Sequence, residues 1–250
     1  MQPDRPEFVP DPDLSRAEME TLQREIAAIA RFDDDPPIDP ASLGERVVAG
    51  VDQAFLEDRA VSAIVALRDG EVIERAGAVS PLSIPYVPGL LSFREGGPII
   101  DAARSLDCEP DLLLFDGSGR IHFREAGLAT HMGVVLDTPS VGVAKGLLCG
   151  TPRASTEGLP EGGRVAIDAD RDVEAPAGTT LGYALQTRQY DSPDRHVNPV
   201  YVSPGHRVGA ASAADHAEAL CARYKLPEPI RLADSYADDL KREAGGAPGD

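Results

Sequence analysis

The chain contains no tryptophan, few other aromatic residues and only three cysteines among its 250 residues. Cys108, Cys149 and Cys221 are widely separated and odd in number, which argues against a disulfide framework or a zinc knuckle and favours reduced thiols. No apolar run approaches the length of a membrane span, and the N-terminus lacks the charged-then-apolar pattern of a signal peptide. We therefore expect a soluble cytoplasmic protein with no membrane partner.

Basic residues are also scarce. Lys and Arg total 24 against 42 Asp and Glu, which gives a formal net charge of −18, and arginine greatly outnumbers lysine. Such a chain repels nucleic acid at low ionic strength. At about 1 M salt the Debye length is roughly 3 Å, so the repulsion is screened and excess carboxylates keep the surface hydrated. Because the acids are spread along the chain, we interpret the composition as halophilic and compatible with a nucleic-acid substrate. The alternative is an acidic surface that repels partners and carries a local basic patch.

The N-terminal part predicts an arm followed by one helix. Residues 1–13 are rich in Pro and Asp, as in an extended segment. Apolar residues at helical spacing predict an amphipathic helix over 15–31, with Ser15 as its N-cap and Glu18 in its first turns. From Arg46 the pattern changes to three β-type runs, RVVAGVDQAF, AVSAIVALRDG and EVIERAGAVS. Asp69-Gly70 between the second and third runs is a strong hairpin pattern, so these runs predict an antiparallel meander.

Helices and strands alternate over the rest of the chain. A helix over 92–106 is expected to be capped by Ser92, with Glu95 three residues later as in a capping box. It is followed by a strand at 112–115, a helix in EAGLATHMGVVLD, strands in TPSVGVAK, GRVAIDAD, GTTLGYALQTR and VNPVYVSPGHRV, and helices over 211–224 and from Glu228. This order predicts an α/β fold, with a mixed sheet in which an antiparallel meander precedes parallel strands and helices flank both. We expect residues 1–40 to form the arm and first helix, 41–245 a single domain, and 246–250 a flexible tail.

An apolar run that ends abruptly in an acid is the most informative local feature. LLLF at 112–115 suits a strand buried on both faces, which places Asp116 at the end of the strand, before the turn Gly117-Ser118-Gly119. The two glycines let backbone approach a ligand closely, and a carboxylate beside such a turn suits a metal ion. The alternative is that this Asp-Gly pair only forms a turn.

Three further acids are candidates for the same site: Asp52 in the first β-run, Glu95 after the meander and Asp234 in the last helix. Asp52 stands among apolar residues, where an unpaired acid is costly, unless it faces solvent at a strand end. If the first and fourth strands are neighbours, Asp52 lies next to Asp116. Carboxylates in a small volume need protons or a cation, and oxygen ligands without cysteine favour Mg²⁺ or Mn²⁺ over zinc. Such a site suits hydrolysis of a phosphodiester by in-line attack of water.

Five segments resemble the endonuclease V family: VAGVDQAF, PYVPGLLSFRE, PDLLLFDGSGRIHFREAGLATHMGVVLDTPSVGVAKGLL, PVYVSPGHRV and LPEPIRLAD. They extend from about residue 47 to about residue 240, in the family's order and spacing. The resemblance implies a ribonuclease-H-like fold and a deoxyinosine 3′-endonuclease of DNA repair. Such an enzyme hydrolyses the second phosphodiester bond 3′ to the deaminated adenine and leaves 3′-hydroxyl and 5′-phosphate ends.

The resemblance also implies the roles of the polar candidates. Asp52 and Asp116 would bind catalytic Mg²⁺, for which Mn²⁺ could substitute, and Glu95 and Asp234 would complete the acidic site. The family allows His or Asp at the position of Asp234. Lys145 matches the family's active-site lysine, which stabilises phosphate or orients the nucleophile. The alternative is a surface lysine at a strand end.

Two histidines lie in matched segments. His122 matches the family histidine that follows the turn, where it would contact phosphate or water; the alternative is a solvated loop residue. Phe123 stands where proline is common in the family, and Ser118 where histidine or other polar residues occur. For His206 we expect a structural role.

The loop Pro85-Tyr86-Val87-Pro88 resembles the family's DNA-binding wedge, because both prolines stiffen the backbone around an exposed aromatic ring. Such a ring can replace the stacking that a flipped base leaves behind. The flipped base would be recognised by backbone from Gly89 and the Gly117–Gly119 turn, between apolar walls from Leu91 and Leu148.

Three hypotheses follow. The first is a monomeric Mg²⁺-dependent endonuclease whose partner is DNA containing deoxyinosine. The second is an inosine-specific endoribonuclease that acts on RNA. The third is a non-catalytic binder of deaminated nucleic acid, which the presence of all four acids argues against.

Overall fold

The computed structural model describes residues 1–82, 84–189 and 197–245, so the tail predicted at 246–250 lies outside the described residues. The strands are β1 Val48–Phe55, β2 Arg59–Arg68, β3 Glu71–Pro81, β4 Leu112–Asp116, β5 Ser140–Ala144, β6 Thr151–Pro152, β7 Arg164–Asp168, β8 Thr180–Leu185 and β9 Val200–His206. The helices are α1 Arg16–Ile29, α2 Leu91–Arg104, α3 Leu128–Val135, α4 Ala210–Ala219 and α5 Glu228–Gly245, with short 3₁₀ turns η1 Pro6–Phe8 and η2 Pro40–Glu45.

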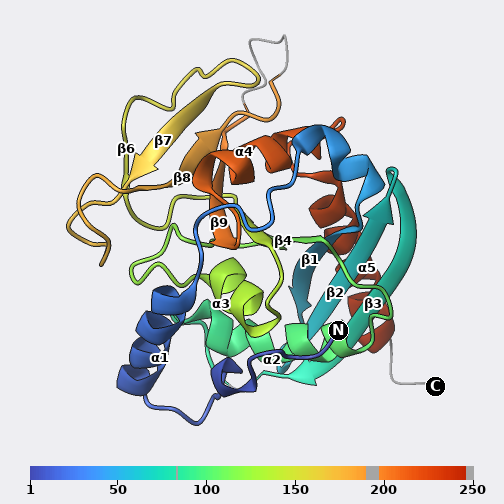
Figure 1. Cartoon of the computed structure of the whole chain (residues 1–250). Coiled ribbons are helices and arrows are strands. Elements are labelled where there is room, and N and C mark those ends of the chain that lie inside the picture. The colour runs from blue at the N-terminus through green and yellow to red at the C-terminus, as the bar shows by residue number, and fades with distance from the viewer. Residues whose placement is uncertain (83, 190–196, 246–250) are drawn as a thin grey trace.

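All of these strands join one mixed sheet in the order β3-β2-β1-β4-β5-β9-β8-β7-β6 (Figure 1). The predicted meander is present, since β2 pairs antiparallel with both β1 and β3. β4 pairs parallel with β1 and with β5, and β5 pairs antiparallel with β9. The predicted fold class and the predicted adjacency of the first and fourth strands are therefore confirmed.

Helices cover both faces of the central strands. Ala49, Val51 and Phe115 pack on the face covered by α2 and α3, while Val48 and Leu114 pack on the face where α4 and α5 lie. This alternation follows from the two-residue period of a strand. Strand β4 is buried on both faces, as its continuous apolar run predicts. Within the described ranges, no helix is long and apolar enough to cross a membrane.

The first helix begins as predicted. Ser15 caps α1 through a capping box, in which the Glu18 N–H donates to the Ser15 hydroxyl and the Ser15 N–H donates to the Glu18 carboxylate. The arm before it lies against the domain, and the N-terminal amine of Met1 donates to the carbonyl oxygens of Ala103 and Leu106.

The predicted start of α2 is wrong. Leu90 is the N-cap residue and makes no side-chain capping bond, while Ser92 and Glu95 are buried within the first turns of the helix. The chain turns at Gly89, whose φ of +79° suits glycine, and enters the helix two residues before the predicted cap. Glu95 is therefore not used as a capping side chain.

Candidate active site

The parallel pairing of β1 and β4 brings Asp52 and Asp116 together. Val51 is the register partner of Phe115, so the two acids that follow occupy neighbouring positions at the same end of the sheet. Asp52 is 8% exposed, and the solvent-facing alternative is therefore wrong. Burial, followed by the neighbouring charge of Asp116, raises the pKa of Asp52 to about 8.

Helices bring the other two acids to this end of the sheet. Glu95 on α2 is 7% exposed, and its burial, opposed by Arg94 and reinforced by Asp116, raises its pKa to about 8. Asp234 lies exposed on α5 within hydrogen-bonding reach of the Asp52 carboxyl. Helix α5 approaches this closely because Gly50 has no side chain, since a Cβ there would lie 2.1 Å from the backbone of Pro229.

Lys145 supplies positive charge among these acids. Its Nζ donates to Asp116 Oδ2 over 2.6 Å, from the residue that follows β5. Burial lowers the pKa of Lys145, but this hydrogen bond and the charges of Asp116, Asp52 and Asp234 outweigh burial and raise it overall. The structure thus places Lys145 in the acidic cluster and not at an unrelated strand end.

The carboxylate oxygens of the four acids are the type of ligand that a hard divalent cation prefers, although the side chains do not converge on one point. In the described ranges, no three His, Cys, Asp or Glu side chains converge in the way that would hold an ion. However, two buried carboxyls whose pKa is raised by burial gain stability when a cation replaces their protons, and all their donor atoms are oxygens. The donor set therefore fits Mg²⁺ or Mn²⁺ better than zinc.

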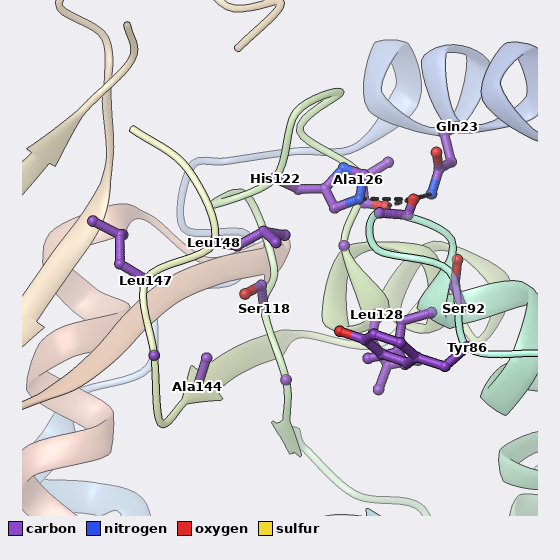
Figure 2. A pocket seen from close by; sticks show the side chains of 15 residues that line it. Gln23, Tyr86, Ser92, Ser118, His122, Ala126, Leu128, Ala144, Leu147 and Leu148 are labelled. Carbon is purple, nitrogen blue, oxygen red and sulfur yellow. Dashed lines mark hydrogen bonds between the residues drawn. The ribbon is translucent and has the colours of Figure 1, made fainter. Parts of the chain in front are cut away.

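A pocket of about 300 Å³ lies at this end of the sheet, and Figure 2 shows side chains that line it. Its wall begins at Gly117, the residue after Asp116. It is lined by Gln23, Tyr86, Gly89, Leu91, Ser92, Gly117, Ser118, His122, Ala126, Gly127, Leu128, Ala144, Gly146, Leu147 and Leu148. Most of the lining is apolar or backbone, with a few polar side chains, as in many sites that hold small ligands.

The predicted pocket residues are largely found in this wall. Gly89, Leu91, Gly117, Ser118 and Leu148 line the cavity. Gly119 does not: its N–H donates to Ser203 Oγ, and a Cβ there would lie 2.2 Å from the carbonyl oxygen of Pro204. Gly119 therefore allows the turn to pack against β9 and does not line the pocket.

The predicted wedge loop stands at the rim of the pocket. Tyr86 is 64% exposed and also lines the cavity, while Pro85 and Pro88 are exposed beside it. Val87 is half-buried and packs with Met19 and Phe93, which anchors the loop between α1 and α2.

His122 is not solvated, contrary to the alternative considered above. It is 3% exposed and lies in the pocket wall, where its Nδ1 accepts from the N–H of Arg124. Its Nε2 is therefore the protonated nitrogen and donates to the carbonyl oxygen of Gly89 over 3.1 Å. Burial, followed by the charge of Arg124, lowers the pKa of His122 to about 4, so the ring is neutral at neutral pH.

His206 has the expected structural surroundings. Its Nε2 lies 3.1 Å from Asp137 Oδ1, and its Nδ1 accepts from the N–H of Arg31. These contacts join β9 to the segment after α1 and lie away from the pocket lining.

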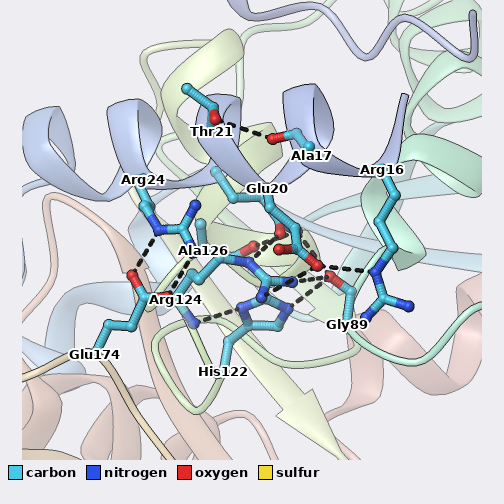
Figure 3. A network of polar contacts seen from close by, with 11 residues as sticks. Arg16, Ala17, Glu20, Thr21, Arg24, Gly89, His122, Arg124, Ala126 and Glu174 are labelled. Atoms are coloured by element: carbon cyan, nitrogen blue, oxygen red, sulfur yellow. Dashed lines mark hydrogen bonds and ion pairs between the residues drawn. The ribbon is translucent and has the colours of Figure 1, made fainter. Parts of the chain in front are cut away.

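A polar network from α1 completes the pocket, and the sequence analysis missed it (Figure 3). Gln23 is buried, and its Nε2 donates to the carbonyl oxygens of Gly89 and Ala126, while its Oε1 accepts from Arg124 Nε. Arg124 also donates to Gly89 and lies 3.8 Å from Glu20. The carbonyl oxygen of Gly89 thus accepts from three side chains: Gln23, His122 and Arg124. In the sequence, Gln23 is one polar residue of a predicted amphipathic helix, and nothing in that pattern indicates a role in the pocket.

The family model for endonuclease V matches residues 31–235, which is most of the chain. The chain belongs to the endonuclease V family. The endonuclease V of the halophilic archaeon Haloarcula marismortui is 60% identical over 265 residues, covering 96% of this chain and 98% of the relative. This similarity agrees with the halophilic origin predicted from the acidic composition. Among solved structures, the endonuclease V of Bacillus subtilis has a TM-score of 0.83 at 30% identity, covering 98% of this chain and 99% of that one.

A further endonuclease V structure was solved with nucleic acid. The Ciona intestinalis protein, in complex with a 24mer DNA containing an inosine followed by a ribo-adenosine, has a TM-score of 0.72 at 25% identity. The match covers 91% of this chain and 98% of that one.

Proposed function

We propose that this endonuclease V is a Mg²⁺-dependent enzyme that recognises deoxyinosine in DNA and hydrolyses the second phosphodiester bond 3′ to it. The products would carry 3′-hydroxyl and 5′-phosphate ends. The observation that carries the proposal is that the acids and the pocket are adjacent. Asp116 is one of the acids, and the next residue, Gly117, lines the pocket. A relative bound to inosine-containing DNA supports the choice of substrate.

The pocket suits one base that has left the duplex. Its apolar walls can stack on a base, and its polar groups can contact the base edge. Tyr86, exposed at the rim, would fill the space that the base leaves in the helix. We expect the N–H groups of Gly89 and Ser118, which donate to no acceptor among the described residues, to face the keto oxygen of hypoxanthine.

The acids and Lys145 would carry the hydrolysis. Asp52 and Asp116 would hold Mg²⁺, with Glu95 and Asp234 completing its surroundings through direct or water-mediated contacts. Bound Mg²⁺ would supply charge stabilisation and lower the pKa of water. Lys145, bonded to Asp116, would face the negative charge that develops on the phosphate.

The test is cleavage of a duplex with a single deoxyinosine in concentrated KCl, with and without Mg²⁺. We expect one nick at the second bond 3′ to the lesion, none in the adenine duplex, and none with Asp52→Asn or Asp116→Asn. Absence of a nick by the wild type, or undiminished nicking by either variant, would reject the proposal. The matched RNA substrate decides between the two nucleases: equal or faster cleavage of RNA would favour the endoribonuclease.

A further inference from the structure

Ser92 has a buried hydroxyl that finds no partner in the protein. The residue is 1% exposed and lies in the first turn of α2, and its Oγ makes no hydrogen bond to any described residue. A buried hydroxyl without a partner is costly, because it has given up its hydrogen bonds to water. Such a group calls for an explanation, and a bound ligand is one of the accepted explanations.

The position of this hydroxyl distinguishes it from the other buried hydroxyls without a partner. Those of Ser62 and Thr130 lie outside the pocket lining, whereas Ser92 lines the pocket, below Gln23 in the view of Figure 2. The ordinary local partners are also unused, since no bond joins Ser92 Oγ to a carbonyl of the preceding turn or to a backbone N–H. Within the lining, Ser92 is therefore a polar group whose partner is missing.

We propose that Ser92 Oγ is a direct hydrogen-bonding contact for the base held in this pocket, and thus a further substrate-binding residue. This inference rests on the proposed function. A serine hydroxyl moves between staggered positions by rotation about one bond, so it can turn toward a base that displaces water from the cavity. It can donate to a keto oxygen or ring nitrogen of a purine. Binding of the base would then offset a cost that the free protein carries.

The proposal makes opposite predictions for stability and for binding. Ser92→Ala removes the unpartnered hydroxyl and keeps the small side chain, so its Tm should equal or exceed that of the wild type. Its affinity for an inosine duplex should nevertheless fall by about tenfold, as expected for the loss of one buried hydrogen bond. Ser62→Ala is the matched control, because it also removes a buried unpartnered hydroxyl but lies outside the pocket. It should bind the inosine duplex like the wild type.

The experiment measures Kd by fluorescence anisotropy for two duplexes, one with deoxyinosine and one with a tetrahydrofuran abasic site that carries no base. The wild type must first prefer inosine over adenine; if it does not, the proposed function fails and not this contact. We expect Ser92→Ala to lose affinity for inosine and to keep its affinity for the abasic duplex. Equal loss on both duplexes, or no loss on inosine, would overturn the proposal.

Ser92→Thr, which keeps the hydroxyl, should retain more of the affinity for inosine than Ser92→Val, which has the same shape without it. Equal affinities of these two variants would also contradict it.

Discussion

The side-chain amide of Gln23 donates to the carbonyl oxygen of Gly89 over 2.9 Å, and so joins α1 to the loop that carries Tyr86. The same amide donates to the carbonyl oxygen of Ala126, in the segment between β4 and α3. Two walls of the pocket are thus held together by a residue from the N-terminal helix. The N-terminal helix therefore forms part of the pocket as well as of the fold.

Gln23→Glu should reduce lesion discrimination while leaving the fold intact. The carboxylate keeps the size of the side chain and can pair with Arg124, but it cannot donate to Gly89 or Ala126. We expect KM for the inosine duplex to rise by about tenfold, with a smaller change in kcat. The control is Gln186→Glu, because Gln186 also bonds two carbonyl oxygens through its Nε2 but lies outside the pocket lining. Equal KM values for the two variants would contradict the role of Gln23.

Lys145→Met should lower the single-turnover rate of nicking by about 10²-fold, the usual effect of removing one group that stabilises transition-state charge. The Lys145 side chain is more than half exposed, so loss of its ion pair with Asp116 should change the free energy of unfolding by less than about 1 kcal/mol. Lys241→Met on α5 is a control for the loss of one positive charge. An unchanged rate in Lys145→Met would show that the ion pair serves only the fold.

Stability without divalent metal should decrease as pH rises from about 4 to about 8. The folded state keeps protons on Asp52 and Glu95 up to a pKa of about 8, whereas the unfolded chain releases them near the ordinary pKa values of 3.8 and 4.5. The folded state therefore binds more protons in this window, and the free energy of unfolding falls by up to about 1.4 kcal/mol per pH unit for each group. Thermal melts in EDTA across this range measure the slope.

Asp52→Asn should remove the contribution of Asp52 to that slope. The variant should melt at a higher temperature than the wild type at pH 8 in EDTA, and the difference should shrink toward pH 4, where the wild-type carboxyl is also neutral. Mg²⁺ should raise the Tm of the wild type at pH 8 and leave that of the variant nearly unchanged. A wild type that is equally stable at pH 5 and pH 8 in EDTA would contradict the raised pKa values.

Tyr86→Ala should weaken discrimination between inosine and adenine duplexes without weakening Mg²⁺ binding. The ring is exposed at the pocket rim, so its removal should change the free energy of unfolding by no more than about 0.5 kcal/mol. Loss of stacking is worth about 1–3 kcal/mol per base, which predicts at least a severalfold weaker affinity for the inosine duplex. The Mg²⁺ titration of the nicking rate is the second measurement. A shifted titration with intact discrimination would show that the loop is not a wedge.

Low salt should unfold the protein. At a net charge of −18, lowering KCl toward about 0.1 M lengthens the Debye length to about 10 Å, and the surface acids then repel one another. Circular dichroism during a KCl titration checks this, with a sucrose titration at low salt to separate charge screening from general stabilisation. Full stability in dilute buffer would contradict the halophilic interpretation of the composition.

The features that depend on local pattern could be predicted from the sequence. The meander, the capping box at Ser15 and the buried strand before Asp116 each follow from residues close together in the chain. The proximity of Asp52 and Asp116 could be predicted on one assumption, that the first and fourth strands are neighbours in the sheet. The roles of the acids, the wedge and part of the pocket lining were then assigned through the resemblance to endonuclease V.

The features that depend on distant partners could not be predicted. Gln23 meets Gly89 across 66 positions, and nothing near Gln23 in the sequence indicates this contact. Ser92 matched a capping pattern, but the turn at Gly89 places it inside the helix and the pocket wall. Gly119 lies in a turn that was predicted to bind the ligand, but its N–H donates to Ser203 on β9. The two-residue strand β6 is too short to leave a pattern.

Asp116 and Gly117 are consecutive residues, one among the acids and the other in the pocket wall. A single peptide bond therefore separates the acids from the pocket, and under the proposed function it sets the spacing between the bound base and the bond that is cut. Substitutions elsewhere in the pocket can change which base is accepted, but they cannot move these two positions apart. An engineered enzyme that accepts another damaged base should still cut at the same number of nucleotides from it. Under the proposed function, base selectivity can therefore change while the cleavage position stays fixed.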